Sequence, residues 1–418
     1  MDTKQFLTEL FQAAVTAADP MQTLASALPE KPNKRILVIG AGKANARMAE
    51  AVEAHWGPCE GLVITRYGYA RPCEGIEIVE AAHPVPDVAG LKATNRILEL
   101  VKSADENTYI LALISGGASA LLTSPAGTIT LTEKQKLNGD LLASGAPITQ
   151  MNIVRKHLSN VKGGQLAAAS YPAELLSLMI SDIPGDDPAF IGSGPTVGDN
   201  STVDDARAIL ERYKFEIPSS VEEALSKPSG VVKTSDKRLS KTTNLIYAAP
   251  SQSLAAAKQV AEQAGCEVSI LGDDLEGEAR ELAIEQIKFA KDVAVKPMTR
   301  PVLILSGGEV TVTKRGSGIG GPNAEYTLAA AIAADGHPQI HVLACDTDGV
   351  DGAAEVAGAY AGPETLEKAR SVGISAERAL NNNDAHSFFA AIQSQIITGP
   401  TLTNVNDFRA ILVMPKEA

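Results

Sequence analysis

Short apolar runs rich in Ile, Leu and Val recur along the first half of the chain, and most are followed by a stretch with helical spacing. After the first run, apolar residues three and four positions apart predict a helix over 42–55 with one apolar stripe. Strands that alternate with helices are typical of a parallel sheet that is covered on both faces. The pattern therefore predicts an α/β fold, with strands at 36–40, 61–65, 76–79, 108–114 and 174–181.

The second half repeats this alternation after an interruption. The stretch 226–244 reads SKPSGVVKTSDKRLSKTTN, and its Ser, Pro, Gly and Lys residues predict a boundary between domains. Beyond it, strand candidates are NLIYAA, EVSILG, PVLILS and IHVLAC, with helices over 251–264 and 276–292. We therefore expect a first domain over residues 1–235 and a second α/β domain over 236–418.

The first twenty residues predict an amphipathic helix. Their apolar face consists of Phe6, Leu7, Leu10, Phe11 and Ala14. The segment lacks basic residues at its start and is interrupted by Glu9, so it is interpreted as a docking helix and not as a signal peptide. No apolar run of the chain approaches the ~20 residues that a membrane span requires.

Composition and charge narrow the class of partner. A chain of 418 residues with 44% hydrophobic content is long enough for two or three domains with real cores. Its 37 basic and 50 acidic residues give a formal charge of −13, which repels nucleic acids and anionic membranes. A small-molecule substrate is favoured, and assembly as a homodimer stays open. The four scattered cysteines have no zinc-binding spacing and predict free thiols in a reducing cytoplasm.

The stretch ILVIGAGKANARMAE (36–50) predicts an anion site where a strand passes into a helix. A dinucleotide fingerprint would need a third glycine where Asn45 stands, and no acid follows the second strand. A Walker loop would need a glycine at Leu37 and a Ser or Thr at Ala44. The site is thus of neither standard type. Lys43 favours negative charge there, and a packing turn with a solvated lysine is the structural alternative.

Three carboxylates follow a buried strand in MISDIPGDDPAFIGSGPT (179–196). Asp182, Asp186 and Asp187 are expected at the carboxyl end of that strand, where α/β enzymes work. Carboxylates of this kind suit Mg²⁺ or accept a proton from an attacking hydroxyl. Ordinary loop residues are the alternative interpretation.

A basic cluster lies in NIVRKHLSNVKGG (152–164). Arg155, Lys156, His157 and Lys162 stand close together in an otherwise acidic protein. Such residues can bind a carboxylate or phosphate, and Arg can do so bidentately. A solvated helical face is the alternative.

Two strands run into Ser-Gly-Gly, at 115–117 and at 306–308, where backbone N–H groups could converge on an anion. A tight turn after a strand is the alternative. Two further turn-rich segments, ACDTDGVDGAAE and ITGPTLTNVND, contain Asp348, Asp351 and Asn404 and are expected to face a ligand.

Taken in order, these motifs resemble those of one family. They are GAGKA, HPVPD, SGGASALL, VRKHLSNVKGG, SDIPGDD, GSGPT, SGGE, GIGGPNAE, DTDGVDG and TGPTLTNVND. This series is similar to that of the two-domain glycerate 2-kinases, which carry a C-terminal MOFRL domain and have often been labelled hydroxypyruvate reductases. The resemblance spans nearly the whole chain. It implies phosphorylation of D-glycerate by ATP, with Mg²⁺, on a Rossmann-like first domain and a smaller MOFRL-type α/β domain around a cleft.

The resemblance also implies roles for individual residues. Matching positions assign catalysis to Lys43 and Asp182. Apart from the resemblance, the chemistry of the carboxylates leads us to expect Asp186 and Asp187 as the metal ligands. The residues expected to bind substrate or phosphate are Ser115, Gly116, Gly117, Arg155, His157, Lys162, Gly307, Gly308, Glu309, Asn323, Glu325, Asp348, Asp351 and Asn404.

One position departs from the family pattern. Many members have an arginine directly after the Gly-Gly of the GIGG segment, and this chain has Pro322 there. The departure puts in question how the transferred phosphoryl group is neutralised, or which substrate is preferred. Arg315 and Arg155 are candidates to compensate.

These observations favour a cytosolic kinase for a small 2-hydroxy acid, because phosphoryl transfer needs positioning and charge neutralisation more than covalent chemistry. An NAD(P)H-dependent hydroxypyruvate reductase is the alternative, favoured by the Rossmann-like start and opposed by Asn45. A binding protein for sugar acids is a third class, and it would leave the acids beside the glycines unexplained.

Overall fold

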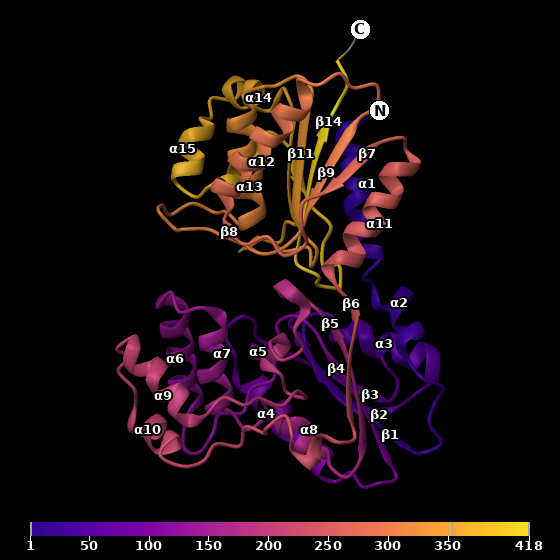
Figure 1. Ribbon diagram of the computed structural model, residues 1–418, viewed down its shortest axis with the longest axis vertical. Coiled ribbons are helices and arrows are strands. Elements are labelled where there is room, and N and C mark those ends of the chain that lie inside the picture. The colour runs from indigo at the N-terminus through magenta and orange to yellow at the C-terminus, as the bar shows by residue number, and fades with distance from the viewer. Residues whose placement is uncertain (1, 353, 417–418) are drawn as a thin grey trace. The chain divides into compact units, whose positions relative to one another are not determined.

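The computed structural model describes residues 2–352 and 354–416. The chain forms two compact units, each built on a six-stranded sheet (Figure 1). We call Pro20–Ser181 with Asp186–Tyr247 the parallel-sheet unit, and Met1–Asp19, Asp182–Gly185 and Ala248–Ala418 the mixed-sheet unit. Each sheet has helices packed against it, so the α/β class predicted from the pattern is confirmed.

The parallel-sheet unit has the strand order β3-β2-β1-β4-β5-β6, and strands β1 to β5 pair in parallel. The five strands expected in the first half are all present. Strand β4 is buried at every position, because a parallel sheet is covered on both faces. The strands are β1 (Arg35–Ala41), β2 (Glu60–Arg66), β3 (Ile76–Ala81), β4 (Thr108–Ile114), β5 (Glu174–Ile180) and β6 (Thr242–Ala248).

Helices of this unit follow its strands and also form a separate apolar cluster. The helices are α2 (Pro20–Ala27), α3 (Asn45–Trp56), α4 (Val88–Lys102), α5 (Ala118–Leu121), α6 (Leu131–Ala143), α7 (Ile148–His157), α8 (Gln165–Ser170), α9 (Val203–Arg212) and α10 (Ser219–Leu225). Figure 1 shows α6, α7, α9 and α10 gathered together, and Leu141, Val154, Ile209 and Val221 are among the residues of their shared core.

The mixed-sheet unit has the strand order β13-β12-β11-β14-β9-β7. Only β7 and β9 pair in parallel among the pairs of this sheet that the structure describes; the others are antiparallel. Its strands are β7 (Glu267–Ile270), β9 (Val302–Ser306), β11 (Ile340–Asp346), β12 (Gly358–Ala361), β13 (Gln395–Ile396) and β14 (Asp407–Val413), with a small separate pair of β8 (Gly277–Glu278) and β10 (Val310–Thr311).

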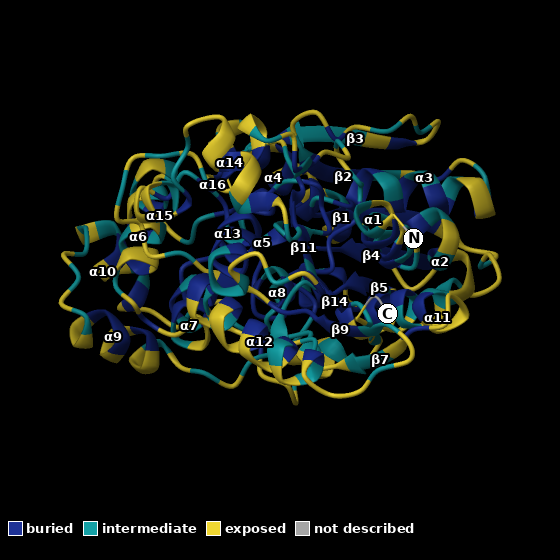
Figure 2. Ribbon diagram, turned by 90° about the horizontal axis from the view of Figure 1, so that it is seen from above, coloured by how far each residue is buried: buried dark blue, intermediate teal, exposed yellow. Residues whose placement is uncertain are grey.

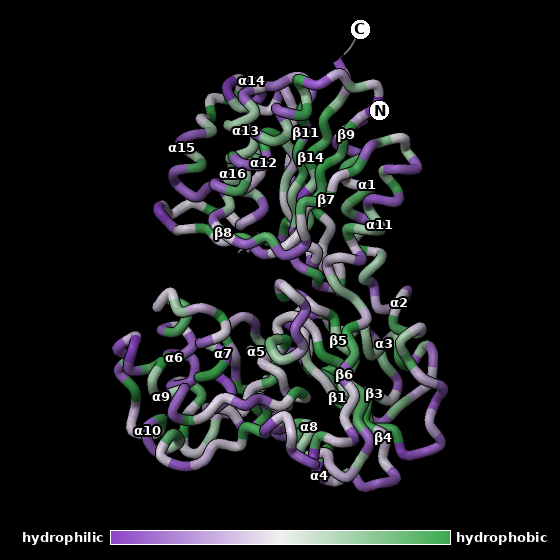
Figure 3. The backbone as a smooth tube through the Cα atoms, in the orientation of Figure 1, coloured by the Kyte–Doolittle hydropathy of each residue, from purple (hydrophilic) through white to green (hydrophobic). Residues whose placement is uncertain are grey.

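Alternate residues of this sheet serve two cores. On β9, Leu303 and Leu305 pack with α1 and α11, whereas Ile304 packs with α12 and α13. This alternation is the period of two that a strand covered on both faces requires. Figure 3 shows β9, β11 and β14 as apolar strands, and Figure 2 shows buried strands beside helices whose outer sides are exposed. The helices are α1 (Thr3–Thr16), α11 (Pro250–Gln263), α12 (Ala279–Ala294), α13 (Pro322–Ala334), α14 (Thr365–Ser371), α15 (Ala376–Asn381) and α16 (Ala385–Ala391).

The compact units depart from the expected division at residue 235 at three places, one of which is the short segment Asp182–Gly185 in the mixed-sheet unit. Strand β6, expected in the second domain, extends the first sheet beside β5. The N-terminal helix α1 packs in the mixed-sheet unit, where the five residues of its apolar face are buried against α11, β11 and β14. The differences at β6 and α1 come from pairings between segments far apart in the sequence.

None of the helices in the described part of the chain is both long and apolar enough to cross a bilayer.

Candidate functional site

The turn after β1 is built on close backbone approach. A Cβ at Gly40 would collide with the carbonyl of Leu113, and one at Gly42 would collide with the Ser115 hydroxyl. Glycine is therefore required at both positions by the neighbouring strand β4. The predicted helix over 42–55 begins later, at Asn45, because residues 42–44 form this turn. Lys43 thus lies ahead of α3 and not in its first turn.

Asn45 ties this turn to the loop after β4. Its side chain is fully buried, its Nδ2 donates to the carbonyl of Leu113 at 2.7 Å, and its Oδ1 accepts from the Ser115 hydroxyl at 2.7 Å. The Ser115 Oγ also accepts from the backbone N–H of Ala44 at 3.2 Å. The position of the third glycine in a dinucleotide fingerprint is thus filled by an amide that bonds to the end of β4 and to the loop after it.

Lys43 lies against the first Ser-Gly-Gly turn. Its backbone N–H donates to the carbonyl of Gly116 at 2.8 Å. Gly117 has φ +83°, and a Cβ there would lie 3.2 Å from the Lys43 Cγ and 3.0 Å from the ring of His83. The structure therefore brings together Lys43, Ser115, Gly116 and Gly117, as expected. The structure also places His83, from the HPVPD motif, beside this turn. No role was assigned to His83 from the sequence.

The basic cluster is buried, so the alternative of a solvated helical face is wrong. Lys156 is 2% exposed and forms an ion pair with Asp199 at 2.5 Å. His157 is held between two hydroxyls, with Nδ1 at 2.6 Å from Ser229 Oγ and Nε2 at 3.1 Å from Ser201 Oγ. Burial lowers the pKa of His157. Both ring nitrogens are occupied, so the structure gives His157 a supporting role and not the expected contact with substrate.

Lys162 joins helix α5 to the glycine-rich GSGPT segment. Its Nζ donates to the Ser119 carbonyl at 2.8 Å, to the Ser119 hydroxyl at 3.2 Å and to the Gly192 carbonyl at 3.4 Å. Ser119 lies in α5, directly after the Ser115–Gly117 turn, and Gly192 lies in the GSGPT segment. Burial, with repulsion from neighbouring cations, lowers the pKa of Lys162 well below its usual value.

Asp182 is oriented by the loop before β14. The Asn404 Nδ2 donates to the Asp182 carboxylate at 3.1 Å, and the Asn406 Nδ2 donates to its carbonyl at 3.0 Å. All three residues belong to the mixed-sheet unit. The expected pairing of Asp182 and Asn404 in one place is present, and Asn406 joins them two residues further along the same TNVND motif.

Asp186 and Asp187, expected to bind metal, belong to the parallel-sheet unit. Asp187 accepts the backbone N–H of Ala189 at 2.9 Å, which closes a turn. One carboxylate oxygen of Asp186 is buried without a hydrogen-bond partner. Within residues 2–352 and 354–416, no group of three or more His, Cys, Asp or Glu side chains is arranged to hold a metal ion.

Asp351 acts as the N-terminal cap of α13. Its carboxylate accepts the backbone N–H of Asn323 at 2.9 Å and of Ala324 at 2.8 Å. These are the donors that a phosphate at this helix end would use, and the carboxylate would repel it. Burial opposes protonation of the neighbouring His386, but the hydrogen bond and charge of Asp351 outweigh it and raise the pKa of His386. The expected role of Asp351 in phosphate binding is therefore replaced by a structural one.

Other expected ligands in the mixed-sheet unit are also engaged within the protein. Glu325 is fully buried, with an ion pair to Arg280 and a bond from Asn383 Nδ2 at 2.9 Å. The Asn323 Nδ2 donates to Asp407 at 2.6 Å, and burial raises the pKa of Asp407. Four other residues were expected to bind substrate or phosphate: Gly307, Gly308, Glu309 and Asp348. Asp348 accepts a turn hydrogen bond from the Val350 N–H. The Gly307 N–H donates to the Gly272 carbonyl, the Gly308 carbonyl accepts from the Asp407 N–H, and Glu309 is exposed.

Pro322 is the first residue of α13, next to the donors that Asp351 caps. Of the two arginines considered as substitutes for the family arginine, Arg315 is exposed in the mixed-sheet unit. Arg155 is largely buried in the parallel-sheet unit.

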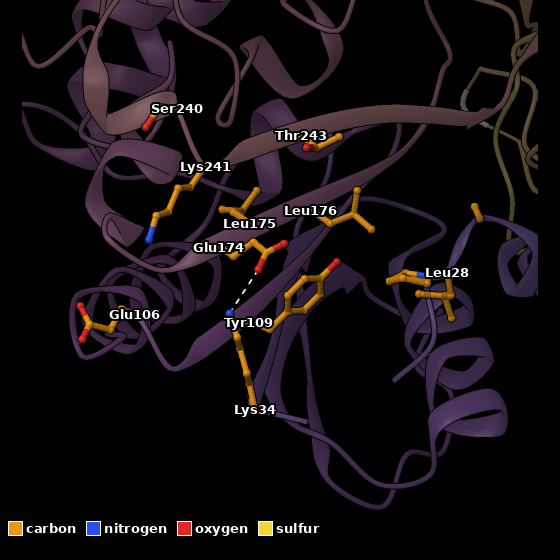
Figure 4. A pocket seen from close by; sticks show the side chains of 12 residues that line it. Leu28, Lys34, Glu106, Tyr109, Glu174, Leu175, Leu176, Ser240, Lys241 and Thr243 are labelled. Carbon is orange, nitrogen blue, oxygen red and sulfur yellow. Dashed lines mark hydrogen bonds and ion pairs between the residues drawn. The ribbon is translucent and has the colours of Figure 1, made fainter. Parts of the chain in front are cut away.

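A hollow of about 640 Å³ in the parallel-sheet unit lies at the opposite end of the strands from Lys43 (Figure 4). Tyr109 and Glu174, at the starts of β4 and β5, line it together with Lys34, which pairs with Glu174 at 3.3 Å. Open α/β sheets bind ligands at the carboxyl ends of their strands. This hollow contains none of the residues expected in the site.

Two family models match parts of this chain. The family described as "Domain of unknown function (DUF4147)" matches residues 6–226, and the MOFRL family matches residues 302–407. A protein of Agrobacterium vitis named "Putative hydroxypyruvate reductase" is 47% identical, over 98% of this chain and 94% of its own length. The D-glycerate 2-kinase of Thermotoga maritima is 37% identical, over 97% of each chain.

The structural comparison gives the same relationship. The crystal structure of a glycerate kinase from Thermotoga maritima superposes with a TM-score of 0.87 at 36% identity, covering 98% of this chain and 99% of that one. The resemblance inferred from the order of the motifs is thus confirmed in sequence and in fold, and the chain belongs to the two-domain glycerate 2-kinase family with a C-terminal MOFRL domain.

Proposed function

We propose that this protein is an ATP-dependent glycerate 2-kinase that acts in the cytoplasm and phosphorylates the 2-hydroxyl of D-glycerate. The observation that carries the proposal is the turn after β1. There, Lys43 stands beside the Ser-Gly-Gly turn, while Asn45 fills the position that a dinucleotide site keeps as glycine. In the dinucleotide fingerprint, the second glycine lets the backbone approach the pyrophosphate, and the third lets the helix pack closely on the strand. A buried amide at this position, bonded to Leu113 and Ser115, supports a phosphoryl grip over a nicotinamide site.

The proposed chemistry assigns one task to each catalytic residue. The 2-hydroxyl oxygen of the acceptor forms a bond to the γ-phosphorus of ATP, the bond to the β,γ-bridging oxygen breaks, and ADP leaves. Asp182, oriented by Asn404, accepts the hydroxyl proton. Lys43 neutralises the charge on the transferred phosphoryl oxygens.

Two carboxylates of this chain are suited to hold Mg²⁺ together with phosphate oxygens of the substrate. A kinase holds this ion with one or two carboxylates plus the phosphate oxygens of its substrate, and does not need a cage of three acids. Asp186 offers a buried carboxylate oxygen without a partner, and Asp187 follows it directly. We assign the metal to these two residues. When bound, Mg²⁺ would supply charge neutralisation on the phosphate chain.

The reductase alternative deserves a direct test, because the relative with 47% identity carries that name whereas the named kinases are less similar. Two assays on the same purified protein decide between them. In the first, ADP formation is followed with ATP, Mg²⁺ and D-glycerate. In the second, NADH and NADPH oxidation are followed with hydroxypyruvate.

We expect ADP to form only when the acid, ATP and Mg²⁺ are all present. Oxidation of either reduced nicotinamide by hydroxypyruvate without ADP formation in the first assay would reject the kinase proposal. Failure of both assays would favour the third class, a protein that binds sugar acids without turnover.

A further inference from the structure

Two cations on neighbouring helices, one buried and one partly buried, lack partners among the described residues. Lys134 on α6 is 5% exposed, and Arg155 lies near the end of α7. Across the described residues, neither side chain has an ion pair or a hydrogen bond, and the Nε of Arg155 is buried without an acceptor. Both line one small cavity, whose other walls are Asn138 and the apolar residues Ile129, Leu137, Leu141, Val154 and Leu158.

A third cation adds to the excess of positive charge. Lys162 is 1% exposed, its partners are neutral groups, and the charges that act on it are those of Lys134, Arg155 and Lys156. Within the same cluster, Lys156 is matched by Asp199. Burying an ionised group without an opposite charge is strongly unfavourable, and proteins usually pair such groups. The charge that is missing here is therefore expected to come from a ligand.

The cavity indicates how large that ligand group is. Its volume of about 10 Å³ is close to what one water molecule needs, and so to the room for one oxygen atom. Arg155 is less buried than Lys134 and leaves a side from which a second oxygen could be held. An ammonium and a guanidinium that share one oxygen-sized space are suited to a carboxylate, because guanidinium groups bind carboxylates in a bidentate manner.

We propose that Lys134 and Arg155 bind the carboxylate of the acceptor acid, an inference that rests on the proposed function and assigns Lys134 to substrate recognition. Contacts within the parallel-sheet unit support this location. Lys162, on which the charges of both cations act, bonds to Ser119 in α5, the helix that directly follows the Ser115–Gly117 turn. The Cγ of Lys43 lies against Gly117 in that turn, so Lys162 connects the two cations with the helix that begins at the proposed phosphoryl grip.

The test compares two lysines on one helix. Lys134→Met removes the buried charge, and Lys136→Met is the matched control, because the Lys136 side chain is 65% exposed and forms a surface ion pair with Asp140. Lys134→Arg keeps the charge. Binding of D-glycerate is measured by calorimetry without nucleotide, and KM for D-glycerate and for ATP is measured in the kinase assay.

We expect Lys134→Met to raise both the Kd and the KM for D-glycerate at least tenfold, the scale of a lost charge-assisted hydrogen bond, while KM for ATP stays within twofold. Lys134→Arg should recover part of this loss, and Lys136→Met should behave as the wild type. A Lys134→Met protein that binds D-glycerate within twofold of the wild type would overturn the proposal. If that variant does not fold, Lys134→Gln gives the same comparison.

The same titrations separate this proposal from the proposed function. If the wild type forms no ADP, the kinase assignment fails. Calorimetry with D-glycerate, D-lactate and acetate still reports on the carboxylate site, which requires saturable binding by the wild type that Lys134→Met loses. No binding of any carboxylate by the wild type would overturn the site. Equal competition by chloride at matched ionic strength would also overturn it, because it would show a site for any small anion.

Discussion

Replacing Lys134 should make the ligand-free protein more stable while it weakens substrate binding. Burial, and then repulsion by Arg155, lowers the pKa of Lys134 from its usual 10.5 to about 8. Each pKa unit between the folded and unfolded states corresponds to about 1.4 kcal/mol. The charged lysine therefore destabilises the fold by about 3 kcal/mol at pH values below both pKa values. Methionine has a similar length and suits the apolar walls of the cavity.

The predicted difference in stability between the wild type and Lys134→Met decreases as the pH rises. Because the pKa is lower in the folded state, the penalty is complete below pH 8, falls as the pH rises from 8 to 10.5, and is absent above 10.5. Urea unfolding of the wild type and Lys134→Met at pH 7 and pH 10 measures it. We expect the variant to be more stable by up to about 3 kcal/mol at pH 7, with a clearly smaller difference at pH 10.

Saturating D-glycerate should raise the stability of the wild type and have little effect on Lys134→Met. A variant that is less stable than the wild type at pH 7, with the same difference at pH 10, would refute the reasoning. That result would mean that the ammonium is satisfied in the folded protein.

The remaining predictions concern four single residues. Lys43→Met should lower kcat by about 10²–10³-fold with unchanged circular dichroism. Asp182→Asn should lower kcat at least as much, because an amide has the shape of the carboxylate but not its basicity. A normal kcat in either variant would show that the residue takes no part in the chemistry. Pro322→Arg should change kcat/KM by less than about threefold, since the backbone N–H groups at the start of α13 are already capped by Asp351. A tenfold gain in the kinase assay would show that no other residue of this chain performs the role of the family arginine. Asp351→Ala should destabilise the protein by about 2–3 kcal/mol in urea unfolding, because two helix N–H groups lose their acceptor and His386 loses the nearby carboxylate, although it keeps the backbone carbonyl of residue 351. A change below about 0.5 kcal/mol would contradict the capping role.

The fold was predictable where the signal is local. All five strands of the first half lie where apolar runs stand, and the five apolar residues of the first helix are buried. The differences arise from long-range pairing. Strand β6 joins the first sheet through β5, and the helix expected over 42–55 starts at Asn45 because Gly42 packs against the Ser115 loop, seventy-odd residues away in sequence.

The candidate site was predictable where motifs fix the backbone. The glycines and Ser115 around Lys43 meet because two strand ends are adjacent, and Asp182 meets Asn404. Residue type alone did not indicate which acidic side chains are already bound within the protein. Asp351 caps a helix, and Glu325 forms an ion pair with Arg280. Residue type also did not reveal Lys134, which in sequence looks like any lysine of an exposed helix and differs from Lys136 only in its burial.

The central claim is that a phosphoryl group moves from ATP to the 2-oxygen of D-glycerate. Phosphorus NMR of the product, recorded with proton coupling, tests it directly because the splitting reports how many protons the phosphorylated carbon carries. We predict ADP and a product signal split into a doublet, since the second carbon of glycerate carries one proton. A triplet would place the phosphate on the third carbon, and the absence of any new phosphorus signal while hydroxypyruvate oxidises NADH would contradict the account altogether.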